Sequence, residues 1–302
     1  MLNLKNIINI VTKRGKLRKY TVSICGRHEK MNNYSKNIYF FYKHIFFQND
    51  KKLSEKVEAL HEAARNYGFS IVKHAENADI IASIGGDGTF LQAVRRTGFR
   101  QDVVYLGIDD DQFRGLYCDF QIDNLPEMIE AMKMDQVEVR KYPVIQVDID
   151  NETSFYCLNE FTIRSAIIKT LVLDVFIDNL HFETFRGDGL VIATPTGSTA
   201  YNKSVRGAVV DPLLPCLQVS EMASLNSNRF RTLGAPFLLS KERTLTLKVA
   251  QEGNVFPTMG MDNEALSIQH VKEVNIQLSD KIIKTVKLKN NSFWEKVKRT
   301  FL

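Results

Sequence analysis

The hydrophobic pattern of the chain changes near residue 140. Before it, four apolar stretches predict strands, at 37–42, 69–72, 79–84 and 103–108. The third is nearly all apolar, which is typical of a parallel strand covered on both faces. Helical patterns lie between them, one over 53–67 that ends at Gly68 and one over 89–97 that ends at Gly98. This alternation predicts a doubly wound, Rossmann-like α/β domain.

After residue 140, short segments alternate apolar and polar side chains, which predicts antiparallel strands. The clearest lie at 144–150, 171–177, 244–250, 273–279 and 282–288. Asp178 and Asn179 predict a turn after the second of them. At the C-terminus, Phe293, Val297 and Phe301 predict a helix with one apolar face. We therefore expect a basic N-terminal extension (1–36) without regular structure, an α/β domain (37–139), a β-rich domain (140–280) and a C-terminal strand and helix (281–302).

Charge is concentrated at the N-terminus. The chain has 302 residues and a net charge of +5, but residues 1–30 hold eight Lys or Arg and one acid, so the remainder carries −2. A basic arm of this kind is more often a solvated extension than a nucleic-acid reader, and we expect no nucleic-acid partner. No apolar run approaches the ~18 residues of a membrane helix, and the N-terminus lacks the order of a secretory signal. The expected location is the cytoplasm, without a membrane partner.

Cysteine and histidine spacing gives no sign of a metal site. The four cysteines, Cys25, Cys118, Cys157 and Cys216, are far apart, so we expect reduced and mostly buried thiols. The six histidines are scattered, without the spacing of metal ligands.

The segment IIASIGGDGTFLQAV, residues 80–94, places Asp87 among three glycines. Gly85, Gly86 and Gly88 allow a ligand close to the backbone, and the next helix, with Thr89 as its expected N-cap, offers unpaired N–H groups. Such a loop favours phosphate, which a carboxylate repels unless it serves the phosphate chemistry. Asp87 is therefore a candidate to hold a divalent cation or to take a proton from an attacking hydroxyl. The alternative is a plain D-G turn.

The segment FYCLNEF, residues 155–161, pairs an amide with a carboxylate after an apolar strand. Asn159 and Glu160 would suit two adjacent hydroxyls of a ribose. Neighbours on a regular strand point to opposite faces, so both reach one ligand only if the strand ends or bulges here. The alternative is a polar strand end.

The segment FRGDGLVIATPTGSTAYNKS, residues 185–204, contains two loops around one buried strand. Asp188 lies in the first loop. In the second, Ser198 or Thr199 is expected to cap a short helix, and Tyr201 offers an aromatic face to a base. The alternative is a capped turn with a core tyrosine.

These three segments, in this order, resemble the NAD kinases of the bacterial, ATP/polyphosphate type. The resemblance rests on G-G-D-G-T at 85–89, N-E at 159–160, and R-G-D-G with T-P-T-G-S-T-A-Y within 186–201. The segment 220–239 also resembles the family, and the likeness runs from about residue 37 to 290. The first motif alone is weak, because lipid kinases and phosphofructokinases have similar loops, but the later motifs make the resemblance specific.

The resemblance implies transfer of phosphate from ATP, with Mg²⁺, to the 2′-hydroxyl of the adenosine ribose of NAD. It also implies an α/β domain followed by a β-sandwich, a homo-oligomer, and Asp87 as the catalytic residue. The phosphate loop would be Gly85, Gly86, Gly88 and Thr89. The implied NAD-binding residues are Asp87, Gly88, Asn159, Glu160, Arg186, Asp188, Thr199, Ala200, Tyr201, Asn202, Lys203, Ser204 and Ala223.

Three positions depart from the family pattern. Asp109, Asp110 and Asp111 stand where the family usually has a glycine-containing turn; they could attract Mg²⁺, but a solvated loop is the stronger expectation. Arg206 replaces a usual glycine, and Asn263 stands where D-G is usual.

Two other functions compete with an NAD kinase. A diacylglycerol-type lipid kinase shares the G-G-D-G-T loop, but it should carry a second loop like G-T-G-N-D, which this sequence lacks. A non-catalytic NAD-binding protein would not need Asp87.

Removal of residues 1–30, so that the chain starts at Met31, is expected to leave folding and kinase activity nearly intact. The family likeness begins only near Asn37, and the arm has no amphipathic period and a charge of +7. Met31 is itself a candidate for the true start. Thermal melts and steady-state kinetics of both forms check this. An arm that clamps acidic nucleotides would instead raise the KM for ATP on truncation, most clearly at low salt. A melting temperature several degrees lower would show that the arm belongs to the fold.

Overall fold

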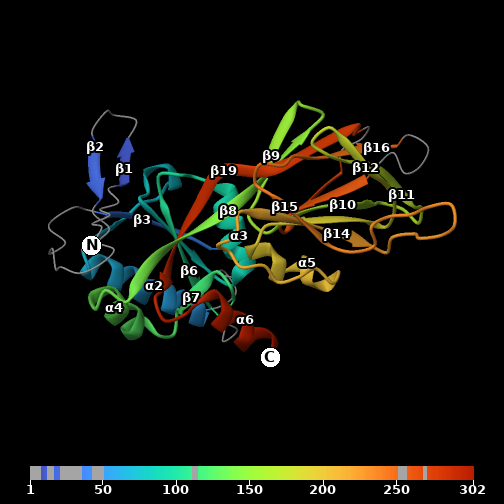
Figure 1. The fold of residues 1–302 in the computed structure, drawn as a ribbon. Coiled ribbons are helices and arrows are strands. Elements are labelled where there is room, and N and C mark those ends of the chain that lie inside the picture. Colours follow the sequence, from blue (N-terminus) through green and yellow to red (C-terminus); the bar gives the residue numbers. More distant parts are fainter. Residues whose placement is uncertain are drawn as a thin grey trace, which may run out of the picture.

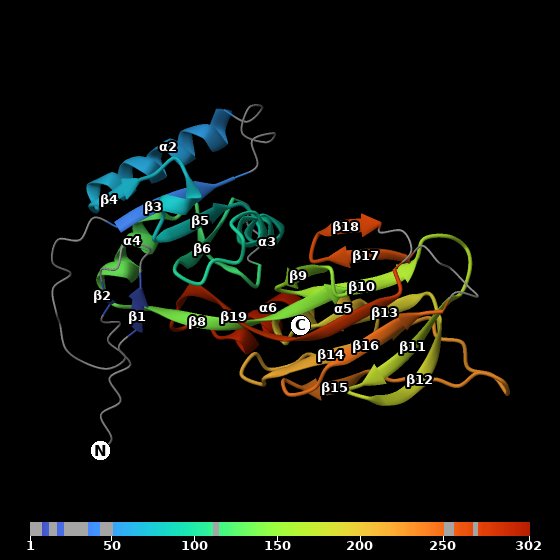
Figure 2. The same cartoon turned by 90° about the horizontal axis from the view of Figure 1, so that it is seen from above.

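The computed structural model describes residues 8–11, 17–20, 36–42, 51–110, 115–250, 257–267 and 271–302. Its elements form an α/β part and a β part that lie side by side (Figures 1 and 2). This confirms the predicted fold class.

The α/β part is built on parallel strands. Its strands are β3 (Lys36–Phe41), β4 (Phe69–Ile71), β5 (Ile80–Ile84), β6 (Val104–Asp109) and β7 (Cys118–Gln121). Its helices are α2 (Lys51–Asn66), α3 (Asp87–Arg96) and α4 (Leu125–Lys133). The strands are ordered β4-β3-β5-β6-β7, and Ile81 of β5 pairs with Tyr39 and Tyr105. Gly68 ends α2 as predicted, with a φ of +79° that glycine adopts without strain.

The β part is a sandwich of two antiparallel layers. Its strands are β8 (Val137–Ile149), β9 (Thr153–Cys157), β10 (Glu160–Ser165), β11 (Leu171–Ile177), β12 (Leu180–Gly187), β13 (Gly189–Ala193), β14 (Cys216–Met222), β15 (Phe237–Ser240), β16 (Leu245–Val249), β17 (Pro257–Met261), β18 (Glu264–Ser267) and β19 (Glu273–Leu288). One layer has the order β15-β14-β13-β10-β17-β18. Side chains of both layers form a shared core, in which Phe161 and Leu217 face Leu173 and Val274. Asp178 and Asn179 make the predicted turn between β11 and β12.

Strands β8 and β19 join the two parts. The sequence predicted separate strands at 273–279 and 282–288, whereas the structure has one strand with a register shift between Leu278 and Ile282. Polar residues at this irregularity interrupt the alternation and so mimic a turn. β19 pairs antiparallel with β16 and parallel with β6, and β8 begins three residues before the expected boundary. Continuous strands therefore cross residue 140, and the domain limits stay a proposal.

Both chain ends differ from expectation. Within residues 1–36 the structure describes two short paired strands, β1 (Ile8–Val11) and β2 (Leu17–Tyr20), which are too short to give a visible period. Cys25, Met31 and the rest of the arm lie outside the described residues. At the other end, the predicted helix is present as α6 (Phe293–Phe301), but its buried residue is Lys296, and Phe301 of the predicted apolar face is 39% exposed.

One further expectation is confirmed for the described residues. Cys118, Cys157 and Cys216 are free and buried. No helix in the described part of the chain is long and apolar enough to cross a membrane.

Candidate functional site

The glycine-rich loop joins β5 to α3, at the carboxyl end of a central strand. The helix begins at Asp87 with Gly86 at the N-cap, so the prediction that Thr89 is the N-cap is wrong. Thr89 instead packs back against the loop: a Cβ on Gly85, whose φ is +129°, would lie 2.5 Å from Thr89 Oγ1. A Cβ on Gly86 or Gly88 would meet no atom of the described residues within 4 Å. Those two glycines therefore face open space.

The Asp87 carboxylate is held by the segment that follows β6. Its oxygens accept the backbone N–H groups of Leu116, at 2.7 Å, and Tyr117, at 2.8 Å. Gly115 passes so close that a Cβ there would collide with the Asp87 side chain. The sequence analysis did not predict this contact. The glycine at position 115 was the only feature of the sequence that could have indicated such a close approach.

Tyr117 connects Asp87 to the second motif. β9 ends at Cys157 and β10 begins at Glu160, so the break needed to aim both motif residues at one ligand is present. The Tyr117 hydroxyl donates to Asn159 Oδ1 at 2.5 Å, while its backbone N–H donates to Asp87. One residue thus links the two motifs.

Asp262 holds the backbone of the second motif. This buried carboxylate accepts the backbone N–H groups of Leu158, Asn159 and Glu160, at 3.1, 2.7 and 3.3 Å. It also pairs with Arg95 of α3, at 3.3 Å. Asp262 therefore joins helix α3, next to the glycine loop, to the turn that presents Asn159 and Glu160.

Neither Asp262 nor its neighbour was among the predicted site residues. Asp262 has a φ of +53°, a conformation in which Asp and Asn are enriched. The sequence feature that could have pointed to Asp262 is therefore an acidic residue in the short turn between β17 and β18. Asn263, noted only as a departure from the family pattern, donates from Nδ2 to the Gly88 carbonyl at 3.1 Å. The turn thus contacts both motifs.

The third motif packs directly on the second. A Cβ on Gly197 would collide with the backbone of Asn159. The hydroxyls of Thr194 and Thr196 donate to the Leu158 carbonyl, at 2.6 and 3.3 Å. Close packing of this loop therefore requires glycine at 197.

The predicted cap of the short helix is wrong. A 3₁₀ turn over Thr196–Thr199 is followed by helix α5 (Tyr201–Ser204), whose N-cap position is Ala200. Ser198 donates its hydroxyl to the Pro195 carbonyl and accepts the Val210 N–H, so its side chain serves the turn instead.

Residues 199–204 have different surroundings. Thr199 and Ala200 are half-buried, and Tyr201 is 39% exposed with its hydroxyl on Met222 Sδ. Asn202 is fully buried: its Oδ1 accepts the Ser220 hydroxyl, and its Nδ2 has no partner among the described residues. Lys203 and Ser204 are exposed.

Three predicted residues lie away from the Asp87–Glu160 centre. β13 pairs with β10 so that Ala193 is opposite Glu160 and Gly189 is opposite Arg164. Asp188, just before Gly189 and five residues from Ala193, is therefore at the other end of the strand, about 17 Å away at ~3.4 Å per residue. Exposed Ala223 follows β14 there, and Arg186 stacks on Phe230. Within this chain these residues form a separate group.

The structure corrects the expectation for the acidic loop. Asp109 is 2% exposed at the end of β6, and its carbonyl accepts the Ile122 N–H, so it is not part of a solvated loop. Asp110 is exposed, and Asp111 lies outside the described residues. Arg206 has a φ of +65°, which explains why glycine is usual at that position.

Glu160 is the electrostatically unusual group of the site. Burial, and then the nearby Asp262 carboxylate, raise the pKa of Glu160 to about 8. The Tyr201 backbone N–H donates to its carboxyl group, but Oε2 is buried and has no partner among the described residues. An unpaired buried acceptor is costly, so this oxygen is suited to a ligand hydroxyl.

Comparisons with known proteins agree on one family. The family model for the ATP-NAD kinase C-terminal domain matches residues 158–288. NAD kinase 2 of Bacillus subtilis (strain 168) is 60% identical over 272 residues, covering 90% of this chain and 100% of that protein. NAD kinase 2 of Geobacillus kaustophilus (strain HTA426) is 61% identical over 265 residues, covering 88% of this chain and 97% of that protein.

Two solved structures share the fold. Yeast NADH kinase complexed with NADH has a TM-score of 0.70 at 18% identity, with 89% of this chain and 88% of that one covered. An NAD kinase from Archaeoglobus fulgidus in complex with ATP has a TM-score of 0.65 at 23% identity, with 88% and 97% covered. High identity over nine tenths of the length, together with the shared fold, shows that this chain belongs to the NAD kinase family.

Proposed function

We propose that this protein transfers the γ-phosphoryl group of ATP to the 2′-hydroxyl of the adenosine ribose of NAD, giving NADP and ADP. Family membership supports the reaction, and one observation supports its location. Asp87 stands at the start of α3, beside glycines that face open space, and Tyr117 links it to Asn159. A candidate base, two glycines without close neighbours at a helix N-terminus and a candidate ribose-binding pair thus belong to one connected structure.

Asp87 is the proposed general base. Two backbone donors fix its orientation, and a carboxylate has about four acceptor positions, so it keeps capacity for the substrate hydroxyl. In the proposed step Asp87 takes the 2′-hydroxyl proton, the oxygen attacks the γ-phosphorus, and ADP leaves. Phosphoryl transfer depends mainly on positioning and charge stabilisation, which a fixed carboxylate and the N–H groups at the start of α3 would provide.

Asn159 and Glu160 are proposed to hold the ribose hydroxyls. Asn159 Oδ1 already accepts the Tyr117 hydroxyl, which directs the amide, and Glu160 Oε2 is the available buried acceptor. A hydroxyl donated to Glu160 favours its charged form. NAD binding would therefore release a proton at any pH below about 8.

This linkage gives a testable pH dependence. The KM for NAD is expected to fall as the pH rises from 6 towards 8, by at most tenfold per unit, and to level off above about 8, where Glu160 is already charged. Glu160→Gln should remove this dependence and raise the KM at pH 8 about tenfold or more, because hydrogen bonds to charged groups contribute roughly 1.5–3 kcal/mol. Steady-state kinetics across this range check both, with the exposed Glu152→Gln as control. If Glu160→Gln has the same NAD kinetics as the wild-type protein, Glu160 does not bind the ribose and is only a polar residue at the end of a strand.

The described residues do not form a protein-only magnesium site. They contain no group of three or more His, Cys, Asp or Glu side chains that could hold a metal ion. We propose that Mg²⁺ arrives with ATP, since this ion is usually bound through substrate phosphates in kinases. Gly86 and Gly88 are the proposed places of closest approach for those phosphates.

The competing functions are less well supported. Both curated relatives named above are NAD kinases, which does not favour a lipid kinase, and the retained, doubly bonded Asp87 does not favour a purely binding protein. Incubation of purified protein with NAD, ATP and Mg²⁺, followed by assay of NADP with an NADP-specific dehydrogenase, tests the proposal. Tight NAD binding without NADP would support the non-catalytic alternative. A homo-oligomer and a cytoplasmic location are further proposals, which rest on the family resemblance.

A further inference from the structure

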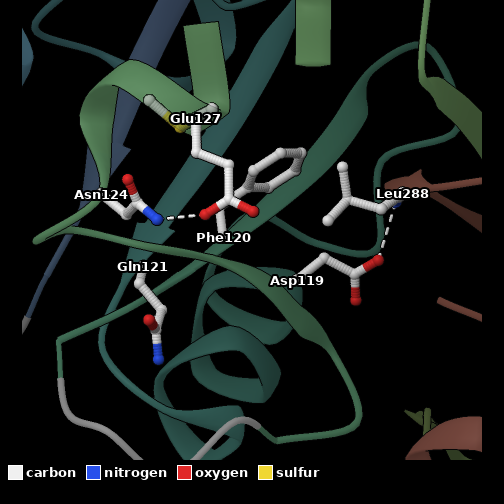
Figure 3. A pocket seen from close by; sticks show the side chains of 7 residues that line it. Asp119, Phe120, Gln121, Asn124, Glu127 and Leu288 are labelled. Carbon is white, nitrogen blue, oxygen red and sulfur yellow. Dashed lines mark hydrogen bonds between the residues drawn. The ribbon is translucent and has the colours of Figure 1, made fainter. Parts of the chain in front are cut away.

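Two buried lysines lie behind the segment that holds Asp87. Lys287 of β19 and Lys296 of α6 have side chains that are 0% and 2% exposed. Both approach Oδ1 of the buried Asp119. The Asp119 Oδ2 accepts the Leu288 N–H at 2.8 Å, the bond drawn beside Asp119 in Figure 3. Two ammonium groups thus share one carboxylate inside the protein.

Burying these charged groups has a large cost in desolvation free energy. Desolvation, and then the Lys287 ammonium, lower the pKa of Lys296 to about 7. Burial lowers the pKa of Lys287, but the surrounding acidic groups, led by Tyr142 and Asp119, together raise it above its ordinary value. Buried ion pairs of this kind add little to stability compared with apolar residues of the same size. Stability therefore does not explain why α6 buries Lys296, and the groups that the Lys296 ammonium contacts give a better explanation.

The ammonium groups contact the peptide that orients Asp87. Lys296 Nζ donates to the Leu116 carbonyl at 2.7 Å, and Lys287 Nζ donates to the same carbonyl at 3.1 Å. That carbonyl belongs to the peptide group whose N–H, on Tyr117, donates to Asp87 Oδ1 at 2.8 Å. The chain of bonds therefore runs from each ammonium through one peptide group to the carboxylate.

Hydrogen bonds in such a chain strengthen one another. An ammonium group at the carbonyl oxygen polarises the peptide group and makes its N–H a better donor, by about 10–30% per bond. Lys287, whose pKa is raised, keeps this charge at neutral pH, and Lys296 adds to it when protonated. Helix α6 is itself well anchored. Ser292 and Glu295 form a capping box, and Trp294 Nε1 donates to Asp211 at 2.9 Å. Lys296 thus acts from a fixed element.

We propose that Lys296 and Lys287 are positioning residues for phosphoryl transfer, which fix and polarise the Leu116–Tyr117 peptide group so that it orients the Asp87 carboxylate. The inference rests on the proposed role of Asp87 as the base. It assigns to the C-terminal helix, far from Asp87 in sequence, a direct part in shaping the catalytic centre.

Lys296→Met tests this proposal, with Lys298→Met as the matched control. Met has a similar length without charge, and Lys298 is an exposed lysine on the same helix. Amide hydrogen exchange over residues 115–119 is expected to become several-fold faster in Lys296→Met and to stay unchanged in Lys298→Met. In the NADP assay, kcat of Lys296→Met should fall about tenfold, with KM for NAD and ATP within twofold. If Lys296 only stabilised the fold, its replacement would not lower kcat while leaving both KM values nearly unchanged.

Wild-type exchange and wild-type kcat in a folded Lys296→Met protein would overturn the proposal. If the single variant does not fold, Lys296→Met combined with Asp119→Asn removes one charge of each sign. The same faster exchange is then expected, and normal exchange would again overturn the proposal. Absence of NADP formation by the wild-type protein would refute the proposed function instead, and the exchange measurement would still decide whether Lys296 fixes the peptide.

Discussion

Asp87→Asn is expected to lower kcat by about 10²–10⁴ while the KM for NAD stays within a few-fold. The amide keeps the shape of the side chain but cannot take a proton, and loss of a general base typically has an effect of this size. The measurement is steady-state NADP formation, with Asp110→Asn, an exposed acid near the same loop, as control.

Two outcomes would contradict this role. Near-normal turnover would remove Asp87 from the role of base. Loss of NAD binding together with a much lower melting temperature would indicate that its main task is to hold the segment after β6, because the amide has only one oxygen for the two N–H groups it must accept.

Asp262→Ala is expected to lower the free energy of unfolding by about 3–5 kcal/mol and to raise the KM for NAD. The substitution leaves Arg95 without its buried partner and strips an acceptor from three backbone N–H groups in the turn that presents Glu160. Urea unfolding and NAD kinetics measure the two effects.

Glu264→Ala is the matched control for this prediction. Glu264 also approaches Arg95, at 3.7 Å, but its side chain is 43% exposed. Its removal should change stability by less than about 1 kcal/mol. Equal effects of the two substitutions would show that Asp262 does not support the ribose-binding turn as inferred.

Local patterns predicted many of the elements, because burial imposes them residue by residue, but β7, α4, β14 and β17 were not predicted. Leu171, Leu173 and Val175 alternate into the core, and the loop around Asp87 lies between a buried strand and a helix as expected. The long strand β19 was divided in two, since its irregularity between Leu278 and Ile282 interrupts the alternation just as a turn would.

The supporting residues of the site could not be predicted, because their roles depend on contacts between distant segments. Tyr117 contacts Asn159, and Asp262 reaches the backbone of the same turn from more than a hundred positions away. Lys296 occupies one face of an amphipathic helix, where sequence alone gives no reason to bury it. Motif residues are visible in a sequence, but the groups that aim them depend on the tertiary fold.

Transfer of label from [γ-³²P]ATP is the most direct test of the central claim, that Asp87 activates the 2′-hydroxyl of the adenosine ribose. The wild-type protein is incubated with labelled ATP, Mg²⁺ and either NAD, an NAD analogue lacking that hydroxyl, or diacylglycerol. The account predicts labelled NADP from NAD alone, and almost none from NAD with Asp87→Asn. Label on the deoxy analogue or on the lipid, or undiminished labelling by Asp87→Asn, would contradict it.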